Sequence, residues 1–197
     1  MAKIEDIKVI TLGNSSVGKT SFLMKYIDNS FTLTYTTTLG VDFKQKKIKL
    51  KNGKDVRLRI FDTAGQERFK AVSVSFIKKA DGVILIYDIS DIESFEAVEN
   101  WLKSIREIGK DKLPIILVGN KCDLSDDKRM ISLKEGQDKA DEFNIPFYET
   151  SCKEGINIKE VFEKLIDDII EKGNKNLMGE FKILNKGKKG KKKEKCC

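Results

Sequence analysis

A glycine-rich stretch near the amino terminus carries the residue types that bind phosphate groups. Gly13, Gly18, Lys19 and Thr20 fit the pattern G-x-x-x-x-G-K-[ST]. The glycines allow the backbone to curl so that successive N–H groups face one centre, and a following helix adds its positive end. The lysine ammonium can reach the β- and γ-phosphates of a nucleotide, and the threonine hydroxyl can bind Mg²⁺. The stretch predicts a phosphate site, the alternative being a glycine turn with an exposed lysine.

The carboxylate of Asp62 is a second candidate group. It ends an apolar, strand-like run and opens the stretch Asp-Thr-Ala-Gly-Gln. A carboxylate at the carboxyl end of a strand, beside a phosphate loop, is suited to a water-mediated contact with Mg²⁺. Aspartate also often ends strands as a turn residue, so Asp62 taken alone is equally compatible with a structural role.

Two polar stretches follow later strand-like runs and could recognise a base. Residues 120–123, Asn-Lys-Cys-Asp, follow the apolar run 115–118, and residues 151–153 are Ser-Cys-Lys. The carboxylate of Asp123 can accept hydrogen bonds from N1–H and the exocyclic amine of guanine, whereas adenine offers no such donor pair. Residues 151–153 would supply backbone and packing around the same ring. Taken alone, each stretch could be an ordinary polar loop.

Composition excludes several classes of function. The chain of 197 residues has no histidine, which removes Ser-His-Asp and Cys-His catalysis and His-ligated metals. Its four cysteines, at 122, 152, 196 and 197, suit neither a disulfide framework nor a zinc site and indicate a reducing compartment. No run approaches the ~18–20 apolar residues of a membrane-spanning helix, and the start lacks a signal-peptide stretch. We therefore expect a cytosolic chain.

The net charge of +7 belongs to the carboxyl-terminal part of the chain. Residues 173–197 contain nine lysines and two glutamates, and the remaining residues carry 29 basic and 29 acidic side chains. Nucleic-acid binding through the lysines is one reading of this tail. The neutral body and the absence of aromatic residues in 186–195 argue against it. A merely solvated linker is another reading of the same lysines.

The order of apolar runs predicts an α/β protein. Strands are expected at 7–12, 44–50, 57–61, 82–87, 115–118 and 146–148, and helices at 20–27, 93–108, 133–143 and 158–170. This order predicts a six-stranded, mostly parallel sheet with one antiparallel edge strand and helices on both faces. With the phosphate-loop motif between its first strand and first helix, this is expected to be a P-loop NTPase fold. Asn52-Gly53 predicts a two-residue hairpin turn of the type that needs positive φ. We expect one domain over 1–172 and a flexible, lysine-rich tail over 173–197.

In order and spacing, these motifs resemble the small GTPases related to Ras, over residues 7 to about 172. The resemblance implies GTP and GDP as bound nucleotides, Mg²⁺ as cofactor and slow hydrolysis of GTP to GDP and phosphate. It implies Mg²⁺ ligands at Thr20, Thr38 and Asp62, with Lys19 and Gln66 in hydrolysis. It also implies nucleotide-binding roles for Ser15, Ser16, Val17, Gly18, Lys19, Thr20, Ser21, Phe31, Tyr35, Thr38, Gly65, Asn120, Lys121, Asp123, Ser151, Cys152 and Lys153.

Within that family, the stretches 39–43, 57–69 and 86–90 resemble Rab GTPases, most of all their exocytic branch. The ending Cys196-Cys197 is similar to the Rab signal for double prenylation. The resemblance implies regulation of vesicle trafficking, with effectors reading Leu39, Gly40, Val41, Asp42, Phe43, Phe61 and Phe76. The chain departs from the usual Rab pattern in three places: Phe61 stands for tryptophan, residues 76–80 read Phe-Ile-Lys-Lys-Ala for Tyr-Tyr-Arg-Gly-Ala, and Cys152 stands for alanine.

The resemblance also implies partners and a location. Expected partners are effectors, an exchange factor, a GTPase-activating protein, a prenylation escort and a GDP-dissociation inhibitor, and no nucleic acid. Residues 15–17 and 31–40 contain no arginine, so we expect the transition-state cation to come from a partner. Prenyl groups and the lysine tail would hold the protein on the cytoplasmic face of intracellular or plasma membranes, cycling with the cytosol. A P-loop ATPase or nucleotide kinase, and a scaffold that binds nucleotide without hydrolysing it, are alternatives.

Overall fold

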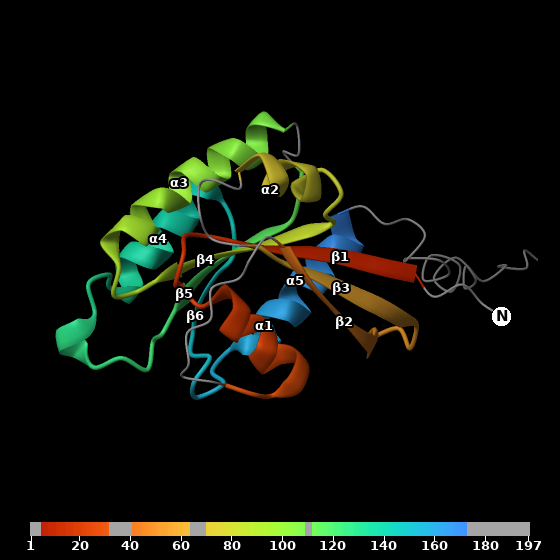
Figure 1. Ribbon diagram of the computed structural model, residues 1–197, viewed down its shortest axis with the longest axis horizontal. Helices are drawn as coiled ribbons and strands as arrows, with labels where there is room; N and C mark the ends of the chain where they lie inside the picture. Colours follow the sequence, from red (N-terminus) through yellow and green to blue (C-terminus); the bar gives the residue numbers. More distant parts are fainter. Residues whose placement is uncertain (1–4, 32–40, 64–69, 109–111, 173–197) are drawn as a thin grey trace, which may run out of the picture.

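Strands and helices alternate along the chain in a computed structural model, which describes residues 5–31, 41–63, 70–108 and 112–172 (Figure 1). The described strands form one six-stranded sheet in the order β2-β3-β1-β4-β5-β6. The elements in chain order are β1 (Glu5–Leu12), α1 (Lys19–Asp28), β2 (Val41–Lys49), β3 (Asp55–Thr63), α2 (Lys70–Ile77), β4 (Gly82–Asp88), α3 (Ile92–Glu107), β5 (Ile115–Asn120), a 3₁₀ helix (Asp126–Lys128), α4 (Leu133–Phe143), β6 (Phe147–Thr150) and α5 (Ile158–Lys172).

The sheet confirms the predicted topology. β2 pairs with β3 in antiparallel register, from Val41 opposite Thr63 to Lys49 opposite Asp55, and it lies at the edge. All other neighbours pair in parallel. The carboxyl ends of β1, β3, β4, β5 and β6 therefore meet at one edge of the sheet, where ligands bind in open α/β sheets.

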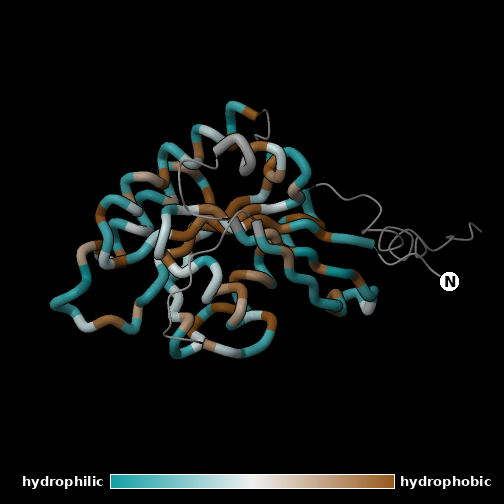
Figure 2. Tube along the Cα trace, in the orientation of Figure 1, coloured by the Kyte–Doolittle hydropathy of each residue, from teal (hydrophilic) through white to brown (hydrophobic). Residues whose placement is uncertain are grey.

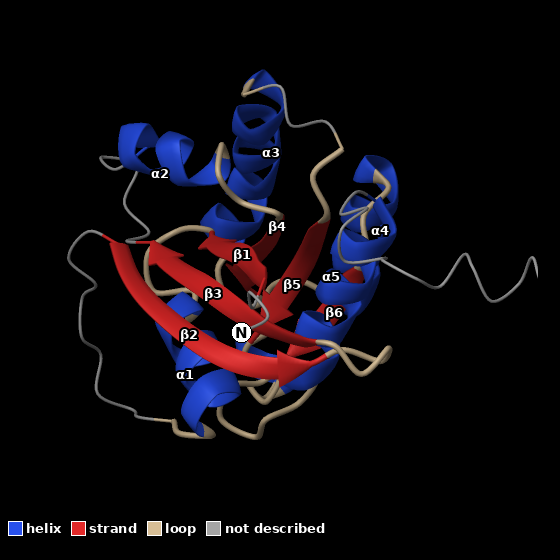
Figure 3. Cartoon of the chain, turned by 90° about the vertical axis from the view of Figure 1, so that its right-hand side faces the viewer, coloured by secondary structure: helices blue, strands red, loops and turns tan. Residues whose placement is uncertain are grey.

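Side chains alternate along the strands between two apolar clusters. In β1, Ile7 and Val9 belong to one cluster, and Ile10 and Leu12 belong to the other. The first cluster packs under α1 and α5, and the second packs under α2, α3 and α4, so the helices cover both faces (Figure 3). Figure 2 shows the hydrophobic residues gathered in the central strands and hydrophilic residues on the outer surfaces. Because side chains alternate with a period of two, this pattern fixes the register of the strands and the face of the sheet on which each side chain lies.

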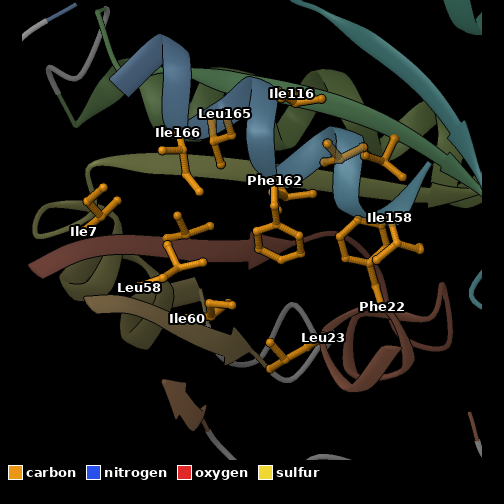
Figure 4. Packing of buried hydrophobic residues seen from close by; sticks show 14 of the residues in the cluster. Ile7, Phe22, Leu23, Leu58, Ile60, Ile116, Ile158, Phe162, Leu165 and Ile166 are labelled. Atoms are coloured by element: carbon orange, nitrogen blue, oxygen red, sulfur yellow. The ribbon is translucent and has the colours of Figure 1, made fainter. Parts of the chain in front are cut away.

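The face under α5 is held by large apolar side chains. Phe162 of α5 lies beside Phe22 of α1, with ring centroids 5.6 Å apart, and stacks on Tyr26 at 3.7 Å. Leu58 and Ile60 of β3 complete this contact from the sheet (Figure 4). Full burial of such a side chain contributes roughly 1.5–3 kcal/mol. This packing holds the helix that follows the glycine-rich loop against the sheet.

The β2–β3 hairpin differs from the prediction of a two-residue turn. The strand register ends with Lys49 opposite Asp55, the Leu50 N–H still donates to the Lys54 carbonyl over 2.9 Å, and the Gly53 N–H donates to the Leu50 carbonyl over 2.8 Å. Only Gly53 has positive φ, at 83°, because Asn52 uses its side chain instead, accepting from the Lys54 N–H over 3.0 Å. A longer loop with one left-handed glycine replaces the predicted turn.

Among the described helices, none combines the length and apolar character that crossing a membrane requires.

Candidate nucleotide-binding site

The loop between β1 and α1 takes the backbone conformation that a phosphate cradle requires. Gly13 and Gly18 have φ of 136° and 97°, and Ser16 is also left-handed, with φ of 63°. A Cβ on Gly13 would lie 2.0 Å from the Ile86 carbonyl oxygen, and one on Gly18 would lie 2.3 Å from Asn120 Nδ2. The two glycines are therefore required by close packing as well as by conformation.

The Lys19 side chain folds back over this loop. Its Nζ donates to the carbonyl oxygens of Gly13, at 3.0 Å, and Asn14, at 2.5 Å, and the residue is only 5% exposed. Trp101 Nε1 of α3 donates to Asn14 Oδ1 over 3.2 Å, which joins the loop to a neighbouring helix. The ammonium is thus positioned at the loop by backbone groups.

Asp62 lies beside the start of α1, as expected for a group that acts on the same ligand. Thr20 Oγ1 donates to Asp62 Oδ2 over 2.5 Å, and Thr11 Oγ1 donates to Asp62 Oδ1 over 3.2 Å. The carboxyl is fully buried. Burial raises the pKa of Asp62 above its ordinary value, against the lowering effect of these hydroxyls and of Lys19. A buried carboxylate beside a hydroxyl forms an oxygen-donor pair of the type that Mg²⁺ prefers.

Asn120, at the end of β5, joins the phosphate loop to the loop after β6. Its Nδ2 donates to the Val17 carbonyl over 2.8 Å. Its Oδ1 accepts from Thr150 Oγ1 at 3.2 Å and from Cys152 Sγ at 3.3 Å. With only 1% of its surface exposed, Asn120 links two loops that come from distant parts of the sequence.

The groups expected to recognise a base gather around Asp123. Ser151 Oγ donates to Asp123 Oδ1 over 2.5 Å, and Lys153 Nζ lies 4.0 Å from Oδ2. Lys121 is held in a left-handed conformation, with φ of 71°, and its Nζ lies 2.5 Å from Asp88 Oδ2. Lys121, Lys153 and the Asp123 carboxylate therefore lie in the loops that follow β5 and β6.

Cys152 lies inside the same group of residues as a buried thiol. Burial raises its pKa to about 12, so the sulfur stays protonated near neutral pH. It packs as a small side chain and donates to Asn120.

Three of the residues expected to contact effectors form one aromatic row. The rings of Phe43 and Phe61 have centroids 5.5 Å apart, and Phe61 and Phe76 are 5.2 Å apart. The Arg59 guanidinium lies 5.0 Å from the Phe43 ring centroid, and Phe43 is 39% exposed. β2, β3 and α2 thus present a continuous aromatic surface.

The remaining expected site residues divide into two groups. Ser15, Ser16, Val17 and Ser21 lie in or just after the phosphate loop, Phe31 is exposed shortly after α1, and Asp42 is exposed on β2, where the backbone of Val41 also lies. A second group lies outside the described residues: Tyr35, Thr38, Leu39, Gly40, Gly65, Gln66, Cys196 and Cys197.

Four residues that hold the site in place were not anticipated from the sequence: Thr11, Asn14, Asp88 and Thr150. Three of them stand at or near the carboxyl end of a parallel strand, where β1, β4 and β6 end. Asp88 lies opposite Asn120, which lies opposite Thr150, in the sheet register. For Asp88 and Thr150, the available sequence signal was a polar residue at the end of a predicted strand.

Comparisons with known proteins agree with this geometry. The model of the Ras family matches residues 8–171. The chain is 46% identical over 170 residues to the Ras-related protein Rab-3D of Homo sapiens. The aligned region covers 86% of this chain and 77% of that protein. The same identity over 170 residues relates it to the GTP-binding protein Rab-3D of Rattus norvegicus and the Ras-related protein Rab-3A of Homo sapiens, with 86% of this chain and 77% and 76% of those proteins covered. The chain belongs to the Ras family of small GTPases, and within it to the Rab group.

Proposed function

We propose that this Rab GTPase binds GTP and GDP through the described site and acts as a nucleotide-driven switch in vesicle trafficking. The observation that carries the site assignment is the position of Asn120. Its amide bonds the phosphate loop through Val17 and the base-recognising loop through Cys152, so phosphate and base groups would be bound by one connected unit. The aromatic row on β2, β3 and α2 supports an effector surface.

Mg²⁺ fits the oxygen donors found here. Thr20, Thr38 and Asp62 would hold the ion, directly or through water, and it would supply positive charge near the β- and γ-phosphates. Thr20 and Asp62 already contact each other, and the buried carboxylate has a raised pKa because it lacks solvation. A divalent cation would favour its ionised form.

Hydrolysis and switching depend on residues assigned by family resemblance. Lys19 neutralises phosphate charge, and Gln66 orients the attacking water, because an amide is a poor proton acceptor. The Thr38 side chain and the Gly65 N–H would contact the γ-phosphate side of the site, and loss of that group would release both loops. Effectors that read residues 39–43 and the aromatic row would thereby distinguish GTP from GDP.

Regulators and a membrane complete the proposed cycle. An exchange factor, a GTPase-activating protein, an escort for prenylation and a GDP-dissociation inhibitor act on this protein. Two prenyl groups on Cys196 and Cys197 give durable anchoring, which one lipid chain does not. The lysines of 186–195 add attraction to the anionic cytoplasmic surface of an intracellular or plasma membrane.

The hydrolytic role of Gln66 is tested with Gln66→Leu. We expect GDP and GTP affinity to stay within about twofold, while single-turnover GTP hydrolysis in the presence of an activating protein falls at least about 10²-fold. The readout is phosphate release from preloaded, full-length protein. An unchanged rate with activating protein present would remove Gln66 from the mechanism.

A further inference from the structure

A cavity of about 590 Å³ lies between the end of α1, the β2–β3 hairpin and α5. Its volume is within the roughly 300–1,000 Å³ of typical binding pockets. Five of its lining residues give it an apolar floor: Tyr26, Ile48, Leu50, Ile158 and Ile166. They are the open edge of the apolar cluster under α1 and α5. None of the residues that we assign to the nucleotide lines it.

The rim of this cavity carries an excess of positive charge. Lys51 pairs with Asp167 at 2.5 Å, and Lys159 Nζ lies 3.4 Å from Glu163. Lys25 and Lys49 also line the cavity, and within the described ranges neither forms an ion pair. A matching occupant is therefore mainly apolar and brings a carboxylate to the rim.

The sequence directly after α5 contains a segment of this kind. Residues 177–184 read Leu-Met-Gly-Glu-Phe-Lys-Ile-Leu, with five apolar residues, one carboxylate at Glu180 and one lysine at Lys182, before the lysine run begins at 186. α5 ends at Lys172, and the next four residues are Gly-Asn-Lys-Asn. Glycine just after a helix is the residue type that ends it in a left-handed conformation and reverses the chain.

The lengths of helix and segment match. From Lys172 back to Ile158, α5 extends roughly 21 Å at about 1.5 Å per residue, and eight extended residues span about 26–29 Å. After a short reversal the segment can therefore run back along the whole length of the groove beside α5.

We infer that residues 177–184 dock in this cavity of their own molecule. Phe181 and the aliphatic side chains cover the apolar floor, and Glu180 approaches the rim lysines. A short tether gives an effective concentration on the order of millimolar, so even a weak contact is populated. Docking shortens the free tether from 25 residues to 13, roughly from 85 Å to 45 Å when extended. Because the hairpin contacts the carboxyl half of α5 through Lys51 and Asp167, the docked segment would begin beside the hairpin, and the lysine run and terminal cysteines would continue from the other end of the groove, beside the start of α5.

Disulfide trapping in the full-length, unprenylated chain tests this inference. Cys196→Ser and Cys197→Ser remove the tail thiols, and Lys49→Cys with Gly179→Cys places one thiol at the rim and one in the segment. The matched control joins Gln137→Cys to Gly179→Cys. Gln137 is exposed on α4, which packs on the second apolar cluster, on the other face of the sheet from α5. Peptide mapping identifies the joined thiols.

The intramolecular disulfide between positions 49 and 179 should form at least about tenfold faster than the control disulfide, since docking holds the two thiols together. Replacing Leu177, Phe181 and Leu184 by serine should reduce this rate to that of the control. None of these three positions belongs to the apolar clusters of the described residues, so the serine variant leaves those clusters unchanged. Equal rates for the two pairs, a serine variant that reacts as fast as its parent, or a disulfide only between two molecules would each overturn the inference.

Discussion

At the scale of single residues, the site depends on buried polar side chains that join separate loops by hydrogen bonds. The buried amide of Asn120 contacts Val17, Thr150 and Cys152 and occupies the space that a side chain on Gly18 would need. Each contact of a buried polar group is costly to leave unmade, by about 1–3 kcal/mol. The loops for phosphate and base are therefore fixed before any ligand arrives, which reduces the ordering cost of binding.

Asp62 should make stability depend on pH in an unusual direction. Because burial raises its pKa, the folded chain holds this proton more tightly than the unfolded chain, and stability falls as pH rises through the window above 3.8. Without Mg²⁺, Asp62→Asn should therefore stabilise the chain at pH 7, and the gain should shrink as the pH is lowered toward 4. Urea midpoints across this range measure the effect.

Asp6 provides a control of opposite sign. Its hydrogen bond to Arg57 Nε, at 2.7 Å, holds its pKa below the ordinary value. That stabilisation is present above pH 3.8 and is lost as pH falls through the lowered pKa, so Asp6→Asn should destabilise at pH 7 and still destabilise near pH 5. If both variants changed stability in parallel across pH 7 to 4, the role given to Asp62 burial would be wrong.

At the scale of elements, the sequence predicted the strands and helices well because their apolar periodicity is local. Alternation along β1 and the apolar stripe of α5 appear in the structure on the faces expected. The predicted two-residue turn was wrong because turn type depends on where strand pairing stops. The last cross-strand backbone hydrogen bond joins the Leu50 N–H to the Lys54 carbonyl, which leaves residues 51–53 as the loop. Among site residues, Asp62 and Asn120 had motif signals. The interaction of Thr11 with Asp62 depends on register between β1 and β3, which no local pattern encodes.

Gly53 and Gly18 both have positive φ but differ in their surroundings, so alanine substitutions at the two positions distinguish backbone strain from steric contact. Gly53 has φ of 83° but open space around it, whereas Gly18 has φ of 97° and faces Asn120. We expect Gly53→Ala to lower the free energy of unfolding by about 1–2 kcal/mol, the cost of a left-handed alanine, without changing GDP affinity. Gly18→Ala should weaken GDP binding at least about 10²-fold, because Asn120 cannot move without losing its hydrogen bonds. Similar GDP affinities in the two variants, measured by titration calorimetry, would contradict this account of the loop.

At the scale of the whole molecule, the net charge and the predicted domain lie in different parts of the chain. The body of residues 1–172 is neutral, and the net charge of +7 lies in residues 173–197. The sheet edge that carries the proposed nucleotide site and the tail that carries the proposed lipids are thus separate parts of the chain. Such a division allows nucleotide state and membrane position to be changed by different mutations.

Removal of the two terminal cysteines tests that division. Cys196→Ser combined with Cys197→Ser should move the protein from membranes to the cytosol, because no lipid can then be attached. GDP affinity should stay within about twofold. Membrane fractionation and imaging of the tagged protein measure the change and name the compartment. A control that replaces Cys122 by serine should leave location unchanged, and membrane retention without both terminal cysteines would exclude prenyl anchoring.

The assignment of Asn120 and Asp123 to guanine recognition is tested most directly by competition between GTP and ATP for the full-length chain with Mg²⁺. We predict that GTP is preferred by at least about 10⁴-fold, because adenine leaves the Asp123 carboxylate unpaired. Asp123→Ala should weaken GTP binding at least about 10²-fold and reduce that preference, whereas Asp126→Ala, in the exposed 3₁₀ helix, should change neither. Comparable binding of ATP, or an Asp123→Ala variant that keeps full preference for GTP, would contradict the account.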